Sequence, residues 1–127
     1  MKYAILFIVG IIATSCMETG RSTEQYFDLS NQDVTRLTTA ASYDHGEAAL
    51  RLGQYYSGSK HDMNAAAQWY KRSAEAGNAQ GMYNLGLYYI SDTSEPQHNH
   101  LARFWLQKAK ESGEPLAGLA LKSLASD

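Results

Sequence analysis

The sequence predicts an all-α fold, an α/α solenoid of about two and a half helical hairpins that follows a signal peptide and a short tether. The first observation behind this prediction is an internal repeat, because LGQYY at 52–56 returns 33 residues later as LGLYY at 85–89. The second is an Ala-x-x-Trp string that follows each copy, at 66–69 and at 102–105. A repeat of this length is typical of stacked hairpins, since one hairpin cannot bury its apolar face alone.

The third observation is the N-terminal segment 1–16, which predicts a lipoprotein signal peptide. Lys2 supplies a positive charge, and the apolar run from Tyr3 to Ala13 is too short to span a bilayer as a stable helix. The small residues before Cys16 resemble a bacterial lipobox, which implies cleavage before Cys16 and lipidation of that cysteine. Two alternatives stay open: the general signal peptidase cuts after Ser15 and leaves a free thiol, or the segment remains as an uncleaved anchor.

Residues 17–43 are expected to form a tether and a capping helix. The tether is polar and lacks helical periodicity, whereas Asn31 or Asp33 is expected to cap a short helix that ends near Ala41. Met17 follows the cysteine, and in sorting of the enterobacterial kind this favours the outer membrane over the inner one. The expected location is therefore the cell envelope, with the protein facing the periplasm and anchored by its lipid.

Residues 44–127 are expected to form the repeat domain. Its helices are predicted at Gly46–Ser57, Met63–Ala76, Ala79–Ser91, Asn99–Ser112 and from Pro115 to about Ala125, with Asp62 as an N-cap. Gly77 is expected to close the first hairpin, because glycine adopts the left-handed conformation without penalty.

Gly53 and Gly86 stand in the middle of predicted helices, where glycine costs about 1 kcal/mol relative to alanine. This cost predicts a close approach of the paired helix at both positions. Large aromatic side chains, those of Tyr56, Trp69, Tyr89 and Trp105, are expected to fill the space between successive hairpins.

Glycines and aromatics in this order resemble the Sel1-like repeat family, which is related to tetratricopeptide repeats. The resemblance covers about Asp44 to Ala125. In the first copy it rests on Ala48, Leu52, Gly53, Tyr56, Gly58, Asp62, Ala66, Trp69, Tyr70, Ala74 and Gly77, and in the second on Gly77, Asn78, Ala79, Tyr83, Asn84, Leu85, Gly86, Tyr89, Ala102, Trp105, Ala109 and Gly113. The chain departs from the pattern at Leu106, which replaces a tyrosine, and at Lys122, which replaces the helix-contact glycine.

The tetratricopeptide-like arrangement implies that the first helix of each hairpin lines a concave face. Residues at i, i+3, i+7 and i+10 point the same way on a helix. The partner-binding groove is therefore expected to contain Glu47, Leu50, Gln54, Gln80, Tyr83, Leu87 and Ile90, with Leu116, Leu119 and Ser123 extending it on the last helix. The alternative is that some of these side chains pack against the next helix.

Two further patterns are interpreted as carrying no chemistry. His98 and His100, in and after the loop 92–98, have no carboxylate or cysteine at a recognised ligand spacing, so a solvent-exposed pair is expected instead of a metal site. Ser57 and Lys60 match the Ser-x-x-Lys string of penicillin-binding enzymes, but that chemistry needs the serine at a helix N-terminus. We therefore expect no enzyme activity, no catalytic residue, no metal, no cofactor and no small-molecule substrate.

The charge distribution argues against nucleic acid as a partner. The net charge is −2, and segment 17–50 carries six acids against two bases, whereas 51–127 carries seven acids and eight bases without a basic stripe. The sequence therefore predicts an exported, lipid-anchored protein-protein interaction module, an adaptor or scaffold at the bacterial cell envelope. The alternative implied by the resemblance is an immunity protein that neutralises a secreted toxin acting in the periplasm, such as a type VI phospholipase effector.

Overall fold

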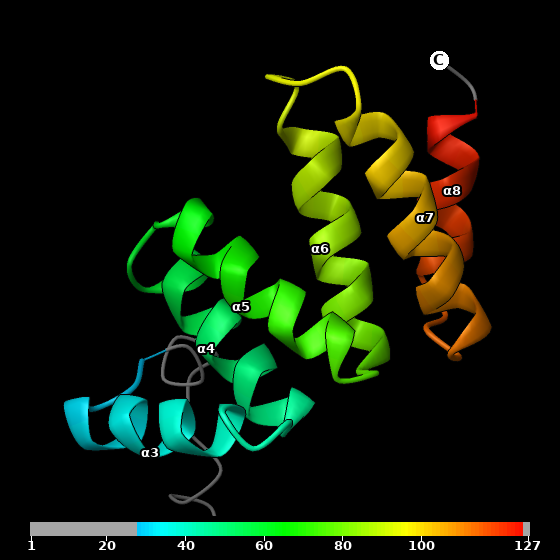
Figure 1. The fold of residues 1–127 in the computed structure, drawn as a ribbon. Coiled ribbons are helices and arrows are strands. Elements are labelled where there is room, and N and C mark those ends of the chain that lie inside the picture. Colours follow the sequence, from blue (N-terminus) through cyan, green and yellow to red (C-terminus); the bar gives the residue numbers. More distant parts are fainter. Residues whose placement is uncertain (1–27, 126–127) are drawn as a thin grey trace, which may run out of the picture.

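The computed structural model describes residues 28–125, and every regular element in this range is a helix (Figure 1). The elements are α3 (Asn31–Ala41), α4 (Gly46–Gly58), α5 (Met63–Glu75), α6 (Ala79–Ser91), α7 (His98–Glu111) and α8 (Ala117–Leu124). Consecutive helices pack against each other along the chain, which confirms the predicted helical solenoid. The predicted signal peptide 1–16 with Cys16, and the tether up to residue 27, lie outside the described residues.

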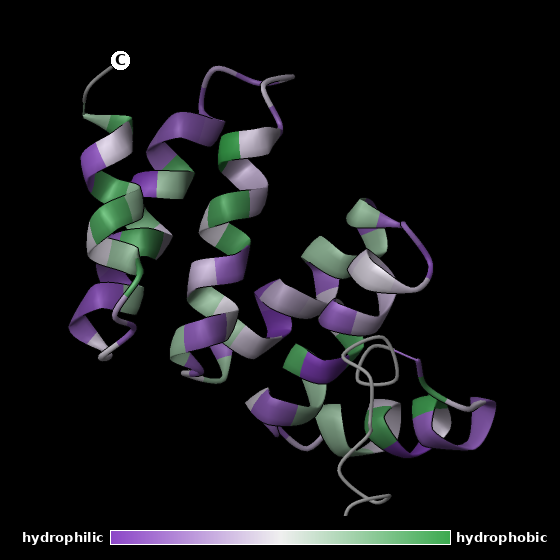
Figure 2. Cartoon of the chain, turned by 180° about the vertical axis from the view of Figure 1, so that it is seen from behind, coloured by the Kyte–Doolittle hydropathy of each residue, from purple (hydrophilic) through white to green (hydrophobic). Residues whose placement is uncertain are grey.

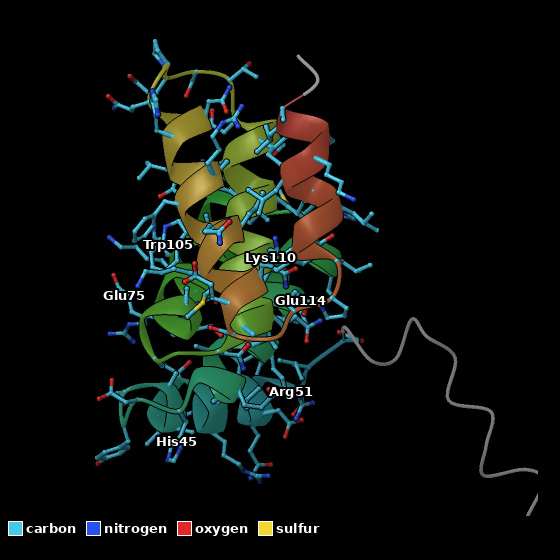
Figure 3. The ribbon with its side chains drawn as sticks, turned by 90° about the vertical axis from the view of Figure 1, so that its right-hand side faces the viewer. His45, Arg51, Glu75, Trp105, Lys110 and Glu114 are labelled. Carbon is cyan, nitrogen blue, oxygen red and sulfur yellow. The ribbon has the colours of Figure 1, made fainter. Side chains whose placement is uncertain are left out.

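The helices form two antiparallel hairpins, α4 with α5 and α6 with α7, flanked by α3 at one end and α8 at the other (Figure 1). Seen from the side, Glu75 of α5 and Trp105 of α7 lie on one side of the molecule, and Arg51 of α4 lies on the other (Figure 3). The first helices of the hairpins, α4 and α6, also contact each other. First helices therefore share one face of the solenoid and second helices share the opposite face.

The N-cap of α3 differs from the predicted one. Ser30 has extended backbone angles and its hydroxyl oxygen accepts a hydrogen bond from the Asp33 amide at 3.1 Å. The same hydroxyl donates to the Asp33 carboxylate at 2.6 Å. This reciprocal pair satisfies the free amide of the first turn, so Ser30, and neither Asn31 nor Asp33, is the cap.

Two other helices also begin with a side-chain cap. Asp62 caps α5, since its carboxylate accepts from the Ala65 amide at 2.9 Å, as predicted. Asn78 caps α6, since its side-chain oxygen accepts from the Gly81 amide at 2.9 Å.

Glycines end α5 and α7 in the same way. Gly77 and Gly113 have φ angles of +87° and +93°, the left-handed region that favours glycine. After each glycine the next amide returns to a carbonyl in the last helical turn, from Asn78 to Ser73 and from Glu114 to Ala109. The predicted closure at Gly77 is confirmed.

The last helix starts later than predicted. It begins at Ala117, and Pro115 lies in the preceding turn, where the Ala117 amide donates to the Glu114 carbonyl. The predicted ends of α4, α5, α6 and α7 differ from the observed ones by at most one residue.

Helix contact at Gly53 and Gly86 is confirmed. A methyl group placed on Gly53 would lie 2.5 Å from two carbons of the Tyr70 ring, and one placed on Gly86 would lie 2.7 Å from Cγ of Leu106. Both distances are below what carbon atoms tolerate, so only glycine lets α5 approach α4, and α7 approach α6, this closely.

Two apolar clusters form the core. One joins the two hairpins and includes Leu50, Tyr70 and Leu85, with Tyr56, Tyr89 and Trp105 packed against it. The other lies under α3, includes Ala41 and Leu52, and has Trp69 packed against it. Tyr56, Tyr89 and Trp105 therefore pack between the hairpins as predicted, whereas Trp69 packs under α3 instead. Figure 2 shows that α8, the last helix of the described residues, is largely hydrophobic.

Candidate functional site

The predicted groove lies on the face of the first helices, α4, α6 and α8. The exposure of equivalent side chains in it increases along the chain, from α4 through α6 to α8. Leu50, Tyr83 and Leu119 occupy the same position in three successive first helices, and they are respectively 2% exposed, half-buried and 63% exposed. Leu50 packs with residues of α6 in the next hairpin, and Tyr83 packs against a cluster that includes Ala117 of α8, whereas no further helix follows α8 within the described residues.

The placement of Leu50 in an open groove is therefore wrong. Its side chain packs in the core cluster that contains Met82 of α6, so it stabilises the contact between hairpins and offers no surface to a partner. Tyr83 also packs against this cluster but keeps part of its side chain accessible.

The outer positions of the groove remain accessible. Leu87 of α6 is 38% exposed and Leu116, just before α8, is 49% exposed. Gln80 is exposed and Gln54 is half-buried. Glu47 is exposed at the edge, and its carboxylate accepts a hydrogen bond of 3.4 Å from the Asn78 side-chain amide. The apolar part of the groove surface thus lies on α6 and around α8, and its polar part on α4.

Ile90 lies at the loop end of the groove. It is half-buried and lines a hollow of about 320 Å³ together with residues of the α6–α7 loop and with Leu124 of α8. Asp92 also lines this hollow, and hydrogen bonds from the side chain and the amide of Ser94, the amide at 3.1 Å, hold the pKa of its carboxyl below the usual range.

The expectation of a solvent-exposed histidine pair is wrong for His98. This residue opens α7, its Nδ1 lies 2.9 Å from the Asp92 carbonyl oxygen, and its ring centroid lies 5.0 Å from that of Tyr89. Its ring is therefore fixed between the loop and α6, whereas His100 is exposed. Within residues 28–125 no three histidine, cysteine, aspartate or glutamate side chains come together as metal ligands would.

Ser57 lies in the last turn of α4, as the sequence indicates. Its hydroxyl donates to the Gln54 carbonyl at 3.1 Å and lies 2.9 Å from the Tyr70 hydroxyl. Lys60 instead lies over the Tyr55 ring, with Nζ 5.4 Å from the ring centroid. Ser57 is thus a packing residue, and burial raises the pKa of its partner Tyr70, while the hydrogen bond between the two hydroxyls acts in the opposite direction.

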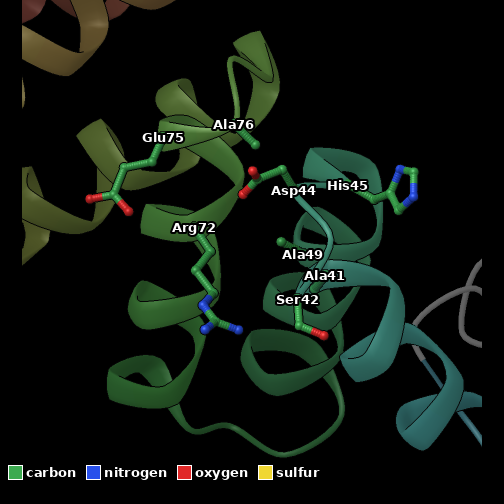
Figure 4. Close-up of a pocket in the computed structure, with 8 residues that line it drawn as sticks. All are labelled: Ala41, Ser42, Asp44, His45, Ala49, Arg72, Glu75 and Ala76. Carbon is green, nitrogen blue, oxygen red and sulfur yellow. The ribbon is translucent and has the colours of Figure 1, made fainter.

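A hollow of about 430 Å³ lies between the α3–α4 turn and the end of α5 (Figure 4). Its titratable lining residues point in different directions: His45 and Glu75 extend to opposite sides, and Arg72 lies with its guanidinium carbon 5.5 Å from the centroid of the Trp69 ring (Figure 4). The hollow therefore brings no acid and base together on one reacting atom.

Sequence reasoning missed an apolar surface on the second helices. Leu101 and Phe104 of α7 are 36% and 50% exposed. The sequence did contain a signal. The equivalent residues of the first hairpin are Ala65 and Gln68, so in the second hairpin leucine replaces alanine and phenylalanine replaces glutamine. Neither position belongs to the residues that define the repeat.

No helix in the described part of the chain has the length and apolar character needed to cross a membrane. This observation bears on residues 28–125 alone.

Comparison with known proteins supports the reading of the fold. The family model described as Sel1 repeat matches residues 46–78 and 79–114, which correspond to the two hairpins. The chain is also similar to the uncharacterized protein YibG of Escherichia coli (strain K12), with 31% identity over 107 residues that cover 81% of this chain and 69% of the relative. No solved structure matches. Sel1 repeats generally mediate binding between proteins. On the match to both hairpins, the chain belongs to the Sel1 repeat family.

Proposed function

We propose that this protein is an exported, lipid-anchored interaction module of the bacterial cell envelope that holds a partner protein in the groove of its first helices. Cys16 carries the anchor in this proposal, the signal peptide ends before it, and the protein faces the periplasm, with the outer membrane favoured over the inner one. The groove consists of Glu47, Gln54, Gln80, Tyr83, Leu87 and Ile90, extended by Leu116 and Leu119.

The observation that carries the binding role is the exposure of leucine side chains on this face. Leu87 of α6, Leu116 just before α8 and Leu119 of α8 are all at least one-third exposed. Apolar side chains gathered on one face are typical of surfaces that bind other proteins. A Sel1 repeat array supports this role, since its members generally act by binding proteins.

Substitution of Leu87 by glutamate tests the groove. A charge at this position would have to be desolvated by a docked partner, which costs several kcal/mol when no opposite charge meets it. Because the native side chain is already partly in water, the fold should tolerate the change. We expect the Leu87→Glu protein to keep its far-ultraviolet circular dichroism spectrum and to lose co-purification of its partner from cells.

Met63→Glu is the matched control, since Met63 is an exposed apolar residue at the start of α5, on the opposite face. If Leu87→Glu keeps its partner, the proposed binding in the groove is wrong.

The identity of the partner separates two roles: an envelope complex indicates an adaptor, whereas a secreted toxin indicates an immunity protein. A separate test of the anchor is metabolic labelling with an alkyne fatty acid, which Cys16→Ala should abolish.

A further inference from the structure

The hollow that Ile90 lines, called the loop-end hollow below, lies where the groove of the first helices ends. Ile90 follows Leu87 by three residues on α6, so the two side chains lie on one stripe of the helix. Figure 1 shows the α6–α7 loop and the C-terminal end of α8 at the same end of the second hairpin. Residues of this loop and Leu124 of α8 bound the hollow of about 320 Å³, so a partner that covers Leu87 reaches it next.

The lining of the loop-end hollow combines apolar surface with acidic side chains. Its apolar part consists of one aromatic and three aliphatic side chains, Tyr89, Ile90, Pro96 and Leu124. Its acids are Asp92 and Glu95, and the described residues that line it include no lysine or arginine. Among the groove residues the charged one is Glu47, which is also an acid. The groove and the hollow together therefore present negative charge to a partner.

The two carboxylates of the hollow keep bonding capacity that the fold does not use. One oxygen of Asp92 accepts from the Ser94 amide at 3.1 Å, and the other lies 3.4 Å from Nδ1 of His98. A carboxylate oxygen has two lone pairs, so each of these oxygens can accept a further hydrogen bond. The Glu95 side chain is exposed, and its carboxylate forms no hydrogen bond or ion pair with the residues that the structure describes.

A basic residue next to the hollow is engaged elsewhere. Arg103 donates a hydrogen bond to the carbonyl of Leu124, and within residues 28–125 no ion pair joins it to Asp92 or Glu95. His98 is the one described side chain that pairs with Asp92 when its ring is protonated. The fold therefore supplies neither carboxylate with a permanent cation from the described residues.

We propose that the loop-end hollow binds an arginine side chain of the partner protein that lies in the groove of the first helices. The inference rests on the proposed function, since it names the chemistry by which the same groove recognises its partner. The guanidinium donates hydrogen bonds to the carboxylates of Glu95 and Asp92, and its aliphatic stem lies on the apolar lining. Arginine suits this site better than lysine, because its planar group pairs with a carboxylate through two parallel bonds and also stacks on aromatic rings.

The size of the hollow favours one side chain of a larger partner over a separate small molecule. Its volume lies at the lower end of the range of about 300–1,000 Å³ that is usual for small-molecule pockets. Contact with the loop is then limited to this side chain, and the rest of the partner lies on the first helices. Because the attraction is between charges that water reaches, binding should weaken as salt is added.

Random dodecapeptides displayed on phage are the probe, selected on the immobilised full-length protein. We expect the enriched peptides to contain an arginine together with large apolar residues. Glu95→Gln is the test variant, because the Glu95 carboxylate has no partner among the described residues and its loss removes no native contact. The affinity of the best synthetic peptide should fall at least about fivefold in Glu95→Gln, as expected when a charge-assisted hydrogen bond is lost at a partly exposed site.

A matched change in the peptide completes the test. Citrulline in place of the arginine, an uncharged group of the same shape, should weaken binding to the native protein at least about fivefold and binding to Glu95→Gln by a smaller factor. Glu111→Gln is the control, since Glu111 is an exposed acid at the other end of α7 whose carboxylate accepts from Gln107 of the same helix. This variant should bind the peptide within about twofold of the native protein.

The outcomes separate this inference from the proposed function. Peptides without enrichment of arginine that lose binding in Leu87→Glu support the groove and overturn the arginine site. Arginine peptides that depend on Glu95 but bind Leu87→Glu as well as the native protein support the arginine site and contradict the groove.

Three further results would overturn the arginine site. One is the enrichment of no peptide. Another is an equal effect of citrulline on the native protein and on Glu95→Gln, which shows that the arginine does not meet Glu95. The third is saturable binding of Ca²⁺, measured by calorimetry and lost in Glu95→Gln, with no arginine peptide enriched, which assigns the hollow to a metal ion.

Discussion

Substitution of Gly53 by alanine is the sharpest perturbation of the fold that the structure offers. Alanine in a helix interior is ordinarily favoured over glycine by about 1 kcal/mol. At position 53 the added methyl group would lie 2.5 Å from Cδ1 and Cε1 of Tyr70. The ring cannot easily move aside, because it is buried and its hydroxyl lies 2.9 Å from the Ser57 hydroxyl.

The clash outweighs the helix preference. Inserting a methyl group into a packed core typically costs about 1–3 kcal/mol, and the fixed ring places this site in the upper part of that range. After subtraction of the gain of about 1 kcal/mol in helix propensity, we expect Gly53→Ala to lower the free energy of unfolding by about 1–2 kcal/mol. For a domain of this size each kcal/mol corresponds to a fall in Tm of about 4–8 °C.

Urea denaturation followed by circular dichroism measures this change. The matched control is Gly118→Ala in α8, where the nearest side-chain atom, Lys110 Cδ, lies 4.0 Å from the added methyl group. That variant should be stabilised by about 0.5–1 kcal/mol, since helix propensity acts there without a clash. In a Tyr70→Ala background, Gly53→Ala should also become stabilising, because the ring is gone. Stabilisation by Gly53→Ala in the native background, equal to that of Gly118→Ala, would refute the close-contact argument.

Three further predictions follow from buried and capping groups. Ser73→Ala should lower the free energy of unfolding, measured by urea denaturation, by about 1–2 kcal/mol, because the buried Ser73 hydroxyl donates to the Gly46 carbonyl at 2.7 Å. Ser123→Ala is the control: Ser123 is exposed and donates only to the Ala120 carbonyl in its own helix, so its free energy of unfolding should change by less than about 0.5 kcal/mol. Asp62→Ala should cost about 1 kcal/mol through loss of the N-cap of α5, and unchanged stability would show that the cap contributes nothing. The hydrogen bonds from Ser94 lower the folded-state pKa of Asp92, so their stabilisation is present above the ordinary carboxyl pKa of about 3.9 and is lost as the pH falls through the folded value. Carbon-detected NMR titration should show the Asp92 pKa rising toward its ordinary value in Ser94→Ala, and an unchanged pKa would contradict this cause.

The sequence predicted those features of the fold that repeat. Gly53 and Gly86 stand at the same place in both copies, and the propensity cost that they share is enough to indicate helix contact. Asp62 and Gly77 were identifiable for a similar reason, because capping chemistry depends on neighbouring residues only. The cap of α3 was misjudged because serine, asparagine and aspartate are almost equally good caps and stand close together in the segment 30–33.

The degree to which each groove residue is buried could not be predicted from the sequence. Leu50, Tyr83 and Leu119 are equivalent by repeat position, and yet the structure buries the first and exposes the last. This difference depends on which helices follow each residue and cover it, which is a property of packing between hairpins and not of helix periodicity. Phe104 occupies the position that Gln68, a polar residue, has in the first hairpin, which suggests an exposed site. Its exposure also depends on the packing between hairpins, so the sequence alone does not establish it.

The measurement that tests the central claim most directly is photo-crosslinking in living cells from a photoreactive amino acid at position 87. Position 94 in the α6–α7 loop and position 35 on the exposed side of α3 serve as comparisons. If the first-helix groove binds the partner, one protein crosslinks strongly from 87, weakly or not at all from 94, and not from 35. A crosslink from 94 with none from 87 would place the working surface on the loop and contradict the groove.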